Sequence, residues 1–301
     1  MNLLRRATHW PIAAKVARTL HVCGPLRKAY YYCVSPPTGV LRVTVCGIGA
    51  AFYARTPEEL RGVERDLLAE HDFLRVLLSA LRSGDVFWDI GSSIGQFAIP
   101  VAKVVGAEGQ VVAFEPESES CRRLQSHIAL NGLSNVRVFQ KALGAQIGKA
   151  TLFVKGHPYP TLIAKGEEVG PRHLTVGEVI PQDSRRYSES FVVSSSGVET
   201  VEVVRGDWFR ATESLPVPRA VKIDVEGYEE FVLRGLERTL SEAACELLCC
   251  EIHPSELGAE LGIDAIIHLV RSMGFARIQL APRWTQIHLT AYKAQTAEAW
   301  P

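Results

Sequence analysis

The sequence predicts an α/β protein with an open, mostly parallel sheet and helices on both of its faces. Two observations indicate this fold. Short apolar runs that end at or beside an acidic residue recur along the chain, at residues 86–90, 110–115 and 220–224. Runs of this length and composition are typical of parallel strands buried on both faces. Amphipathic stretches at helical spacing follow these runs, which is the alternation expected of successive βαβ units.

The first 57 residues are strongly basic. They contain eight lysine and arginine residues and no acid, whereas the rest of the chain holds 25 basic and 33 acidic side chains. We expect residues 1–57 to form an N-terminal extension, with a basic helix to residue 34 and then a hairpin of strands 40–45 and 50–54. A basic surface helix without a ligand and weak contact with a membrane surface both fit this charge. No nucleic-acid partner is expected.

A helix over residues 58–81 leads into the stretch around which the chain is organised. Residues 86–90 form the first buried strand, with Asp89 near its end. Gly91 and Gly95 then allow the backbone to turn sharply and to approach a ligand closely. Apolar residues at helical spacing predict a helix directly after this turn, over residues 96–105. Its free N–H groups and positive dipole end therefore face the loop.

The second strand, residues 110–114, leads directly into Glu115. A carboxylate in this position suits a ribose, because both ribose hydroxyls can donate hydrogen bonds to it. Glu115 follows Gly91 by 24 residues, close to the spacing of a nucleotide-binding βαβ unit. A structural glycine turn followed by a solvated glutamate is the alternative. We favour a nucleoside site because the strand, the turn and the acid occur together.

The composition of the turn narrows the choice of nucleoside. Ser92 and Ser93 follow the first glycine, so the G-x-G-x-x-G run that lets a backbone approach a pyrophosphate is absent. This difference disfavours a dinucleotide. S-adenosylmethionine carries no phosphate, and it requires an acid near its amino group, a glycine turn and an acid on its ribose. Asp89, the turn and Glu115 meet these three requirements.

The middle of the chain is less regular. The elements expected next are a helix over residues 118–130 and strands over residues 136–139 and 151–154. Between these strands, Ala142 and Leu143 follow at the same strand edge, where they could cover an adenine face; an ordinary turn is the alternative. Residues 155–198 are rich in glycine, proline, serine and charge and have little periodicity. We interpret them as a long insertion, either a lid or a disordered segment.

The second half of the chain repeats the strand and helix pattern. The expected elements are strand 201–204, a short helix from residue 207, strand 220–223, helix 228–240, strand 246–250, a helix over residues 255–273 and an antiparallel pair at 275–280 and 286–291. Asp224 and Glu251 each follow a buried strand directly. Because ligands bind at the carboxyl ends of the strands in such sheets, we expect both acids to converge there with Asp89 and Glu115.

The composition excludes several classes of protein. A chain of 301 residues with 47% hydrophobic and 22% charged residues is ordinary for a soluble globular protein. No apolar run is long enough to predict a transmembrane helix, and Pro11, Lys15 and Arg18 interrupt any core of a secretory signal. The seven cysteines are odd in number and include no C-x-x-C pair, which argues against a zinc knuckle or a disulfide framework. We expect reduced cysteines and a cytoplasmic location.

Several motifs together resemble the FkbM family of S-adenosylmethionine-dependent methyltransferases. The most specific is Val221-Lys222-Ile223-Asp224-Val225-Glu226-Gly227-Tyr228-Glu229. The others are Val86 to Gly91 with Gly95, Ala113-Phe114-Glu115-Pro116, Asn131-Gly132, Ala142-Leu143-Gly144, Val232 to Gly235, and Glu251-Ile252-His253. The resemblance extends from about residue 40 to residue 273. The chain departs from the family at Ser92-Ser93-Ile94, where members usually read Ala-Asn-Val, and in the insertion at residues 155–198.

The resemblance implies a Rossmann-like class I methyltransferase fold with a mostly parallel seven-stranded sheet, in a domain that covers residues 58–301. It also implies methylation of a hydroxyl group on a sugar, a polyketide or another small acceptor. We expect S-adenosylmethionine to be bound by Asp89, Gly91, Ser92, Ser93, Gly95, Glu115, Pro116, Ala142, Leu143 and Asp224.

Methyl transfer to a hydroxyl group requires in-line alignment and a general base. Asp224, at a strand end beside the cofactor edge, is the first candidate, and His253 is the second because its unperturbed pKa suits proton transfer. Glu226 could orient the acceptor or cap the following helix. Lys222 lies inside a strand and is expected to pair with an acid. Together with Glu251, the three candidates could bind a divalent ion, but this spacing is common and we predict that no metal is used.

Two other functions share part of this pattern. A nicotinamide-dependent oxidoreductase would use the same sheet and the same ribose acid, but it would need the missing pyrophosphate loop. A non-catalytic module that binds nucleotides or anions through the basic N-terminus would have a degenerate cofactor site. Asp89, Gly91, Gly95 and Glu115 are all present, which argues against degeneration.

Overall fold

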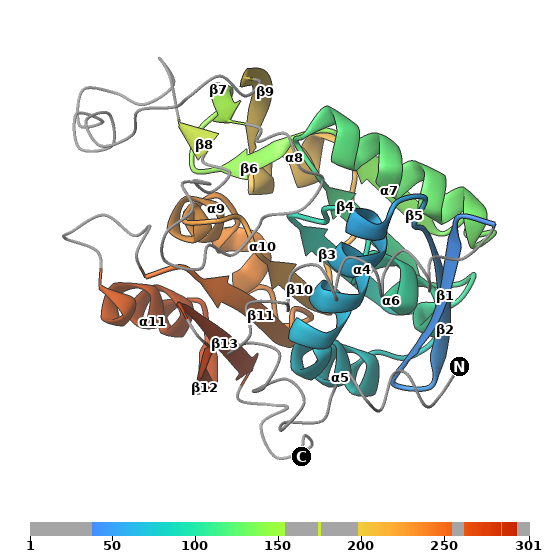
Figure 1. Cartoon of the computed structure of the whole chain (residues 1–301). Coiled ribbons are helices and arrows are strands. Elements are labelled where there is room, and N and C mark those ends of the chain that lie inside the picture. The colour runs from blue at the N-terminus through green and yellow to red at the C-terminus, as the bar shows by residue number, and fades with distance from the viewer. Residues whose placement is uncertain (1–37, 154–173, 176–197, 255–261, 284, 294–301) are drawn as a thin grey trace, which may run out of the picture.

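A seven-stranded sheet forms the centre of the computed structural model, which describes residues 38–153, 174–175, 198–254, 262–283 and 285–293. The strand order is β12-β13-β11-β10-β3-β4-β5 (Figure 1). These strands are β3 (Val86–Ile90), β4 (Gln110–Phe114), β5 (Val136–Phe139), β10 (Ala220–Ile223), β11 (Leu247–Ile252), β12 (Phe275–Arg283) and β13 (Gln286–Lys293). The five strands from β11 to β5 pair in parallel, and β13 is antiparallel to both of its neighbours. The predicted α/β fold with a mostly parallel seven-stranded sheet is confirmed.

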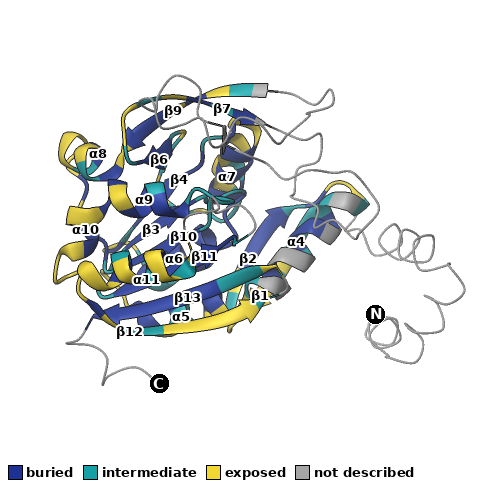
Figure 2. Ribbon diagram, turned by 90° about the vertical axis from the view of Figure 1, so that its left-hand side faces the viewer, coloured by how far each residue is buried: buried dark blue, intermediate teal, exposed yellow. Residues whose placement is uncertain are grey.

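Helices cover both faces of this sheet. On one face lie α4 (Pro57–Ala69), α5 (His71–Ala80), α6 (Ala98–Val105) and α7 (Ser118–Leu130), and on the other α8 (Gly206–Thr212), α9 (Glu229–Gly235), α10 (Glu237–Ser241) and α11 (Ile263–Ser272). Successive residues of a strand point to opposite faces, so Phe87 enters the first core and Trp88 the second. Figure 2 shows the central strands largely buried and the outer surfaces of α8, α10 and α11 exposed.

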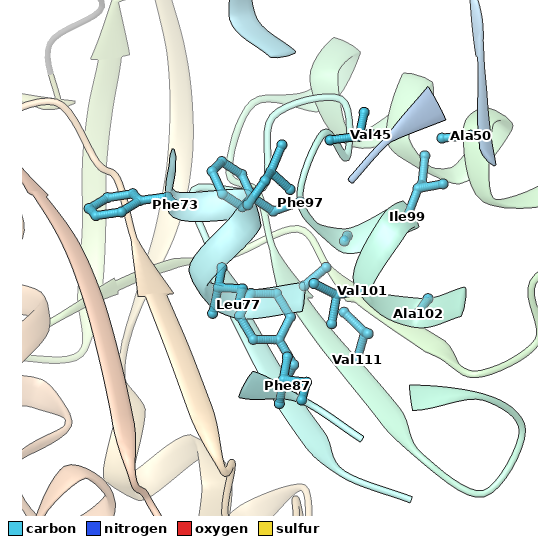
Figure 3. Packing of buried hydrophobic residues seen from close by; sticks show 14 of the residues in the cluster. Val45, Ala50, Phe73, Leu77, Phe87, Phe97, Ile99, Val101, Ala102 and Val111 are labelled. Atoms are coloured by element: carbon cyan, nitrogen blue, oxygen red, sulfur yellow. The ribbon is translucent and has the colours of Figure 1, made fainter. Parts of the chain in front are cut away.

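The first core fixes α6 directly behind the loop that follows β3. Phe73 and Leu77 of α5 lie beside Phe97, which precedes α6, while Phe87 of β3 packs beneath them (Figure 3). Each of these side chains is almost completely inaccessible to solvent. Because packed apolar interiors tolerate little displacement, this cluster holds the start of α6 and the loop before it in a defined position.

A hairpin and a second sheet flank the central sheet. The hairpin consists of β1 (Val40–Val45) and β2 (Ile48–Tyr53) in antiparallel pairing, as predicted. The second sheet has the order β6-β9-β7-β8 and consists of β6 (Ala142–Gly144), β7 (Gly148–Phe153), β8 (Leu174–Thr175) and β9 (Val198–Arg205). Strand β6 of this sheet packs tightly on α9: the two backbones are so close that a Cβ atom on Gly235 would lie 2.1 Å from the carbonyl oxygen of Gly144. The second sheet is thereby joined to the helix that follows β10.

Two sequence expectations were wrong in detail. The helix expected over residues 58–81 is divided into α4 and α5 at Glu70, which is the N-cap residue of α5. The helix expected over residues 228–240 is divided at Leu236, whose ψ of 12° leaves the helical range. There Gly235 combines a weak helix preference with the close contact to β6. Ala142 and Leu143, for which an ordinary turn was the alternative to a contact with adenine, form a strand of the second sheet.

Several expectations fall on other parts of the chain. The basic segment as far as residue 37, most of the 155–198 insertion and residues 255–261 lie outside the described residues. The expected domain boundary at residue 57 stays a prediction, and the hairpin before it contributes Val45, Ala50 and Phe52 to the first core. Among the residues that the structure describes, no helix combines the length and the apolar character needed to span a membrane.

Candidate active site

The loop after β3 packs against the ends of both neighbouring strands. Backbone N–H groups of Gly91 and Ser92 both donate to the carbonyl oxygen of Phe114, at 3.0 Å, at the end of β4. Gly91 has a φ of +76°, and a Cβ atom there would lie 1.8 Å from the carbonyl oxygen of Asp224. Glycine is therefore required at this position by the contact with the end of β10 as well as by its backbone conformation.

The same loop holds the predicted acid at the end of β4. The Ser93 N–H group donates to Oε2 of Glu115 at 2.7 Å, and the Glu117 N–H group donates to Oε1 at 2.9 Å. Ser93 has a positive φ of 48°, a conformation that is uncommon for a residue with a side chain. Because Glu115 is only 7% exposed, both of its carboxylate oxygens are held in a fixed orientation beside the loop.

Lys222 lies between two of the predicted acids. Its Nζ atom is 3.7 Å from Oδ1 of Asp89 and 3.3 Å from Oδ2 of Asp224, and it donates to the carbonyl oxygen of Gly91 at 3.0 Å. Burial alone would lower the pKa of Lys222, but the negative charges of Asp224 and Asp89 have the larger combined effect, so the pKa is raised. Burial alone would raise the pKa of Asp224, but the positive charge of Lys222 and its hydrogen bond lower it, and the pKa of Asp224 falls below its usual range. The predicted pairing of Lys222 with an acid is confirmed.

His253 lies between two carboxylates. Its Nδ1 atom is 2.7 Å from Oε1 of Glu229, and its Nε2 atom is 3.3 Å from Oε2 of Glu226. Burial lowers the pKa of His253, but the hydrogen bond to Glu229 and the charge of Glu226 outweigh it and raise that pKa to about 10. Burial raises the pKa of Glu226 to about 7, although His253 acts to lower it. The side chain of Glu226 is 29% exposed, that of His253 is 6% exposed and that of Glu229 is completely buried. Of these three side chains, Glu226 is therefore the one that a ligand can reach.

A second group of ionisable side chains adjoins the first through Glu251. Nε2 of His288 lies 3.7 Å from Oε2 of Glu70 and 3.6 Å from Oε2 of Glu251, and the other oxygen of Glu251 lies 3.8 Å from Nε2 of His253. The His288 ring stacks on Phe73 with the ring centroids 3.9 Å apart. Burial, and then the charge of a neighbouring acid, raises the pKa values of Glu70 and Glu251 to about 8. The two acids are therefore protonated to a large extent at neutral pH, whereas burial lowers the pKa of His288.

Two sets of described side chains have donor atoms close enough together to coordinate a cation. In each set the candidate ligand atoms lie within 4.8 Å of one another, and the sets are Glu70 with Glu251 and His288, and Asp224 with Glu226 and His253. Acidic side chains often lie this close together without an ion. The absence of a metal requirement therefore stays a prediction.

The structure brings most of the predicted site together. Asp89 and Asp224 share Lys222 as a partner, Glu251 adjoins His253, and Glu115 is joined to the same loop through Ser93. Pro116 follows Glu115 at this edge and is partly exposed. Ala142 and Leu143 are buried in β6, so their contact with an adenine ring stays a prediction.

Four residues of the site were missed from the sequence. Glu229 could have been found, because it belongs to the most specific motif and follows Gly227 at the start of an expected helix. Glu70 and His288 carry no local signal, and neither does Gln286, whose side-chain amide lies 3.1 Å from Nε2 of His253. They reach the site only because the helix breaks at Glu70 and because β13 returns antiparallel beside β11.

A sequence model described as the methyltransferase FkbM domain matches residues 89–276. Hexuronic acid methyltransferase AglP from Haloferax volcanii is 28% identical over 220 residues, which cover 72% of this chain and 77% of that protein. The match to the FkbM domain begins at the carboxyl end of β3 and includes β4, β10 and β11, and the ends of these strands carry the site.

Two solved structures give weaker matches. An rRNA methylase from Streptococcus thermophilus is 12% identical with a TM-score of 0.43, over 74% of this chain and 95% of that chain. Aeropyrum pernix fibrillarin in complex with natively bound S-adenosyl-L-methionine is 11% identical with a TM-score of 0.40, over 73% of this chain and 74% of that chain.

Proposed function

The chain belongs to the FkbM family of S-adenosylmethionine-dependent methyltransferases, and we propose that it methylates a hydroxyl group of a sugar acceptor. The observation that carries the proposal is the arrangement at the carboxyl ends of β3, β4 and β10. There, a loop-bound carboxylate, Glu115, lies at the same edge as two partly exposed carboxylates, Asp224 and Glu226. The first suits a cofactor ribose and the other two suit an acceptor hydroxyl.

The residues at this edge fit S-adenosylmethionine by the chemistry of their polar groups. Glu115 is buried and is oriented by two backbone N–H groups, and a carboxylate at the end of this strand suits the two hydroxyls of a ribose. Lys222 keeps the pKa of Asp224 low, and Asp224 is partly exposed, which suits a cofactor that carries a sulfonium and an ammonium charge. Asp89 is completely buried, and burial raises its pKa. The Ser92 and Ser93 loop does not resemble a pyrophosphate cradle.

When bound, S-adenosylmethionine supplies an activated methyl group, and the protein must then align the acceptor oxygen and remove its proton. We assign proton removal to Glu226. Its raised pKa of about 7 suits a base that works near neutral pH. It is also more exposed than His253, and His253 at a pKa of about 10 is already protonated at neutral pH.

Asp224, the first candidate from the sequence, has a different environment. Lys222 lowers its pKa, which favours a permanently charged group that orients the acceptor hydroxyl over a group that takes up a proton. Its position next to the glycine loop also allows contact with the cofactor. Asp224 therefore stays in the proposed site with a binding role, and the kinetic comparison of Asp224 with Glu226 described in the Discussion separates the two assignments.

The acceptor class follows from the family and from the similarity to a hexuronic acid methyltransferase. We propose a glycan that contains uronic acid or a related sugar. A nicotinamide-dependent oxidoreductase and a non-catalytic module are not favoured by membership of a methyltransferase family. A cytoplasmic location and weak contact of the basic segment with membranes remain part of the proposal. Cys121, Cys245, Cys249 and Cys250 are buried free thiols, which suits a reducing compartment.

The test is a methyl-transfer screen with labelled S-adenosylmethionine. The acceptors are uronic acid glycans, the same glycans with the carboxyl group reduced to an alcohol, neutral glycans and a set of polyketide alcohols. We expect label in an ether linkage on the uronic acid glycans, located by NMR of the product. Transfer only to polyketides would contradict the acceptor class. Lack of transfer to any hydroxyl acceptor, with intact binding of S-adenosylmethionine, would contradict O-methylation.

A further inference from the structure

Glu229 reaches His253 from the beginning of α9. Its Oε1 atom lies 2.7 Å from Nδ1 of His253 and also accepts the N–H group of Gly227 at 2.8 Å. The side chain of Glu229 is completely buried, and that of His253 is 6% exposed. The carboxylate is therefore fixed by the turn after β10, and it fixes in turn one edge of the imidazole ring.

We propose that Glu229 is a positioning residue for the reaction: it holds the imidazole of His253 so that Nε2 faces Glu226. The proposal deepens the proposed function, since it rests on Glu226 being the base of that reaction. Glu229 acts through His253 and does not itself touch a reacting group, because no part of it is accessible to solvent.

The hydrogen bond determines which ring nitrogen carries a proton. A carboxylate accepts hydrogen bonds and cannot donate one when it is ionised, so Nδ1 of His253 must carry the proton that Glu229 accepts. This leaves Nε2 to interact with the groups on the opposite side of the ring. Oε2 of Glu226 lies 3.3 Å from Nε2 of His253, and the side-chain amide of Gln286 lies 3.1 Å from the same atom. The amide nitrogen can donate to Nε2 when the ring is neutral, and the amide oxygen can accept from Nε2–H when the ring is protonated and the amide is turned over. When His253 is fully protonated, its Nε2–H group points a positive charge at the proposed base.

Four acidic side chains face His253 from the elements packed against it, and one of them, Glu251, is largely protonated at neutral pH. Glu229 of α9 and Glu226 of the turn face its two nitrogens, Asp224 follows β10, and Glu251 of β11 lies 3.8 Å from Nε2. Of these four, Glu229 is the one hydrogen-bonded to the ring at 2.7 Å. Removing its charge should reduce the protonation of His253, and a less charged His253 should raise the pH at which Glu226 becomes ionised.

The test is the substitution Glu229→Gln. The glutamine carbonyl oxygen can still accept the Gly227 N–H group, so a purely structural role at the turn is preserved while the charge facing His253 is lost. The matched control is Glu230→Gln, which makes the same chemical change in the next residue of α9, where the carboxylate instead bonds to Nε of Arg234 at 2.7 Å. Both variants are full-length chains, and their folding is checked by thermal unfolding and by titration with S-adenosylmethionine.

The first readout is the imidazole of His253, observed in proton–nitrogen NMR spectra and assigned by its absence in His253→Gln. In the wild type we expect Nδ1 of His253 to carry a proton. In Glu229→Gln the proton affinity of His253 should fall at least tenfold, and in Glu230→Gln it should stay unchanged. A wild-type ring protonated at Nε2 alone would overturn the proposal, as would a pKa that does not respond to Glu229→Gln. The wild-type spectrum decides the tautomer even if Glu229→Gln does not fold.

The second readout is the pH dependence of kcat/KM with a sugar acceptor identified by the methyl-transfer screen proposed above. We expect the rising limb of the profile to move to higher pH in Glu229→Gln and not in Glu230→Gln. If Glu229→Gln is active and its kcat/KM rises over the same pH range as in the wild type, the proposal is overturned, while the proposed function stays in place. If the NMR result is as expected but no hydroxyl acceptor is methylated, the position of His253 is established and the proposed function is what fails.

Discussion

Nζ of Lys222 lies 3.3 Å from Oδ2 of Asp224, two residues further along the same chain segment. The lysine side chain is 3% exposed, whereas that of Asp224 is 26% exposed, so the pair joins the interior of the sheet to its ligand-binding edge. Lys222 is in addition 3.7 Å from Asp89 and lies 4.8 Å above the ring of Phe97. One buried cation thus stabilises acids from two neighbouring parallel strands.

Removing this cation should destabilise the protein strongly. In Lys222→Met, Asp89 and Asp224 lose their buried partner, and breaking a buried ion pair in this way costs about 3–5 kcal/mol. We expect a loss of this size in the free energy of unfolding, measured with urea. Lys103→Met is the control, because Nζ of Lys103 bonds to the Gly49 carbonyl oxygen at the surface, and it should cost less than about 1 kcal/mol. Equal stability of the two variants would contradict the role given to Lys222.

Replacing the proposed base should remove the pH dependence of turnover near neutrality. A base acts in its ionised form, so kcat/KM of the wild type should rise with pH through the Glu226 pKa of about 7 and then level off. In Glu226→Gln, we expect kcat/KM no longer to rise with pH in this range and kcat to fall by about 10²- to 10⁴-fold. Binding of S-adenosylmethionine, measured by calorimetric titration, should be unchanged.

Asp224 provides the competing assignment. Asp224→Asn should also reduce turnover strongly, but it should keep the rising limb, because Lys222 already holds the pKa of Asp224 low. If Asp224→Asn removes the limb and Glu226→Gln retains it, then Asp224 is the base. A fully active Asp224→Ala enzyme would exclude Asp224 from both the base and the orienting role.

Glu115→Gln should weaken binding of the cofactor. The glutamine amide has one acceptor oxygen in place of two, so it cannot hold the Ser93 and Glu117 N–H groups and also accept from two ribose hydroxyls. Losing one hydrogen bond to a charged group costs about 1.5–3 kcal/mol, or roughly 10- to 150-fold in the dissociation constant. Calorimetric titration with S-adenosylmethionine measures this change. The control is Glu119→Gln on the surface of α7, where Arg122 is the partner, and binding as tight in Glu115→Gln as in this control would contradict a ribose contact.

The sequence predicted the parts of the site that depend on local pattern. Asp89 lies near the end of an apolar run, and Glu115 and Asp224 follow such runs directly. Parallel pairing brings such strand ends to one edge without further information. The reason for Gly91 was only partly accessible. Its turn could be read from the chain, but its contact with the Asp224 carbonyl oxygen depends on the pairing of β3 with β10.

The remainder of the site depends on tertiary packing. Glu70 looks like a mid-helix residue in the sequence, and it becomes part of the site only because α4 and α5 separate there. His288 lies in the reversed strand β13, where its register with Glu251 brings the two together. The pKa values of these buried acids arise from neighbours that are distant in the chain, so composition and spacing contain no signal for them.

The reaction should proceed without a divalent metal ion. Asp224, Glu226 and His253 could coordinate one by their spacing, but Lys222 already neutralises Asp224 and Glu229 already holds Nδ1 of His253. We therefore expect methyl transfer to be unchanged after exhaustive treatment with EDTA and gel filtration. Loss of activity that magnesium restores would contradict this prediction, and the two sets of candidate ligands would then be tested by Glu226→Gln and His288→Gln.

The buried acids should make the protein less stable as the pH rises above neutrality. Burial raises the pKa values of Glu70 and Glu251 from 4.5 to about 8, so the folded state retains protons that the unfolded state releases. The resulting contribution to stability is complete below the unfolded pKa and is lost as the pH rises through the folded pKa of about 8. His253, with a pKa raised to about 10, contributes stability that is complete below its unfolded pKa of about 6.5 and is lost as the pH rises through its folded pKa. The buried imidazole of His127, whose pKa is lowered to about 4, acts in the opposite direction, but only at acid pH.

We accordingly expect the melting temperature to fall by on the order of 5 °C between about pH 7 and about pH 9. Glu70→Gln should reduce this fall, because a neutral amide in that position has no proton to lose. Glu108→Gln, at an exposed position between α6 and β4, should leave the fall unchanged and serves as the control. Differential scanning calorimetry across the pH range measures the effect. A melting temperature that is constant or rises over this range would show that the acids beside His288 and His253 are ionised in the folded protein, and the raised pKa of Glu226 on which its role as the base depends would then lose its support.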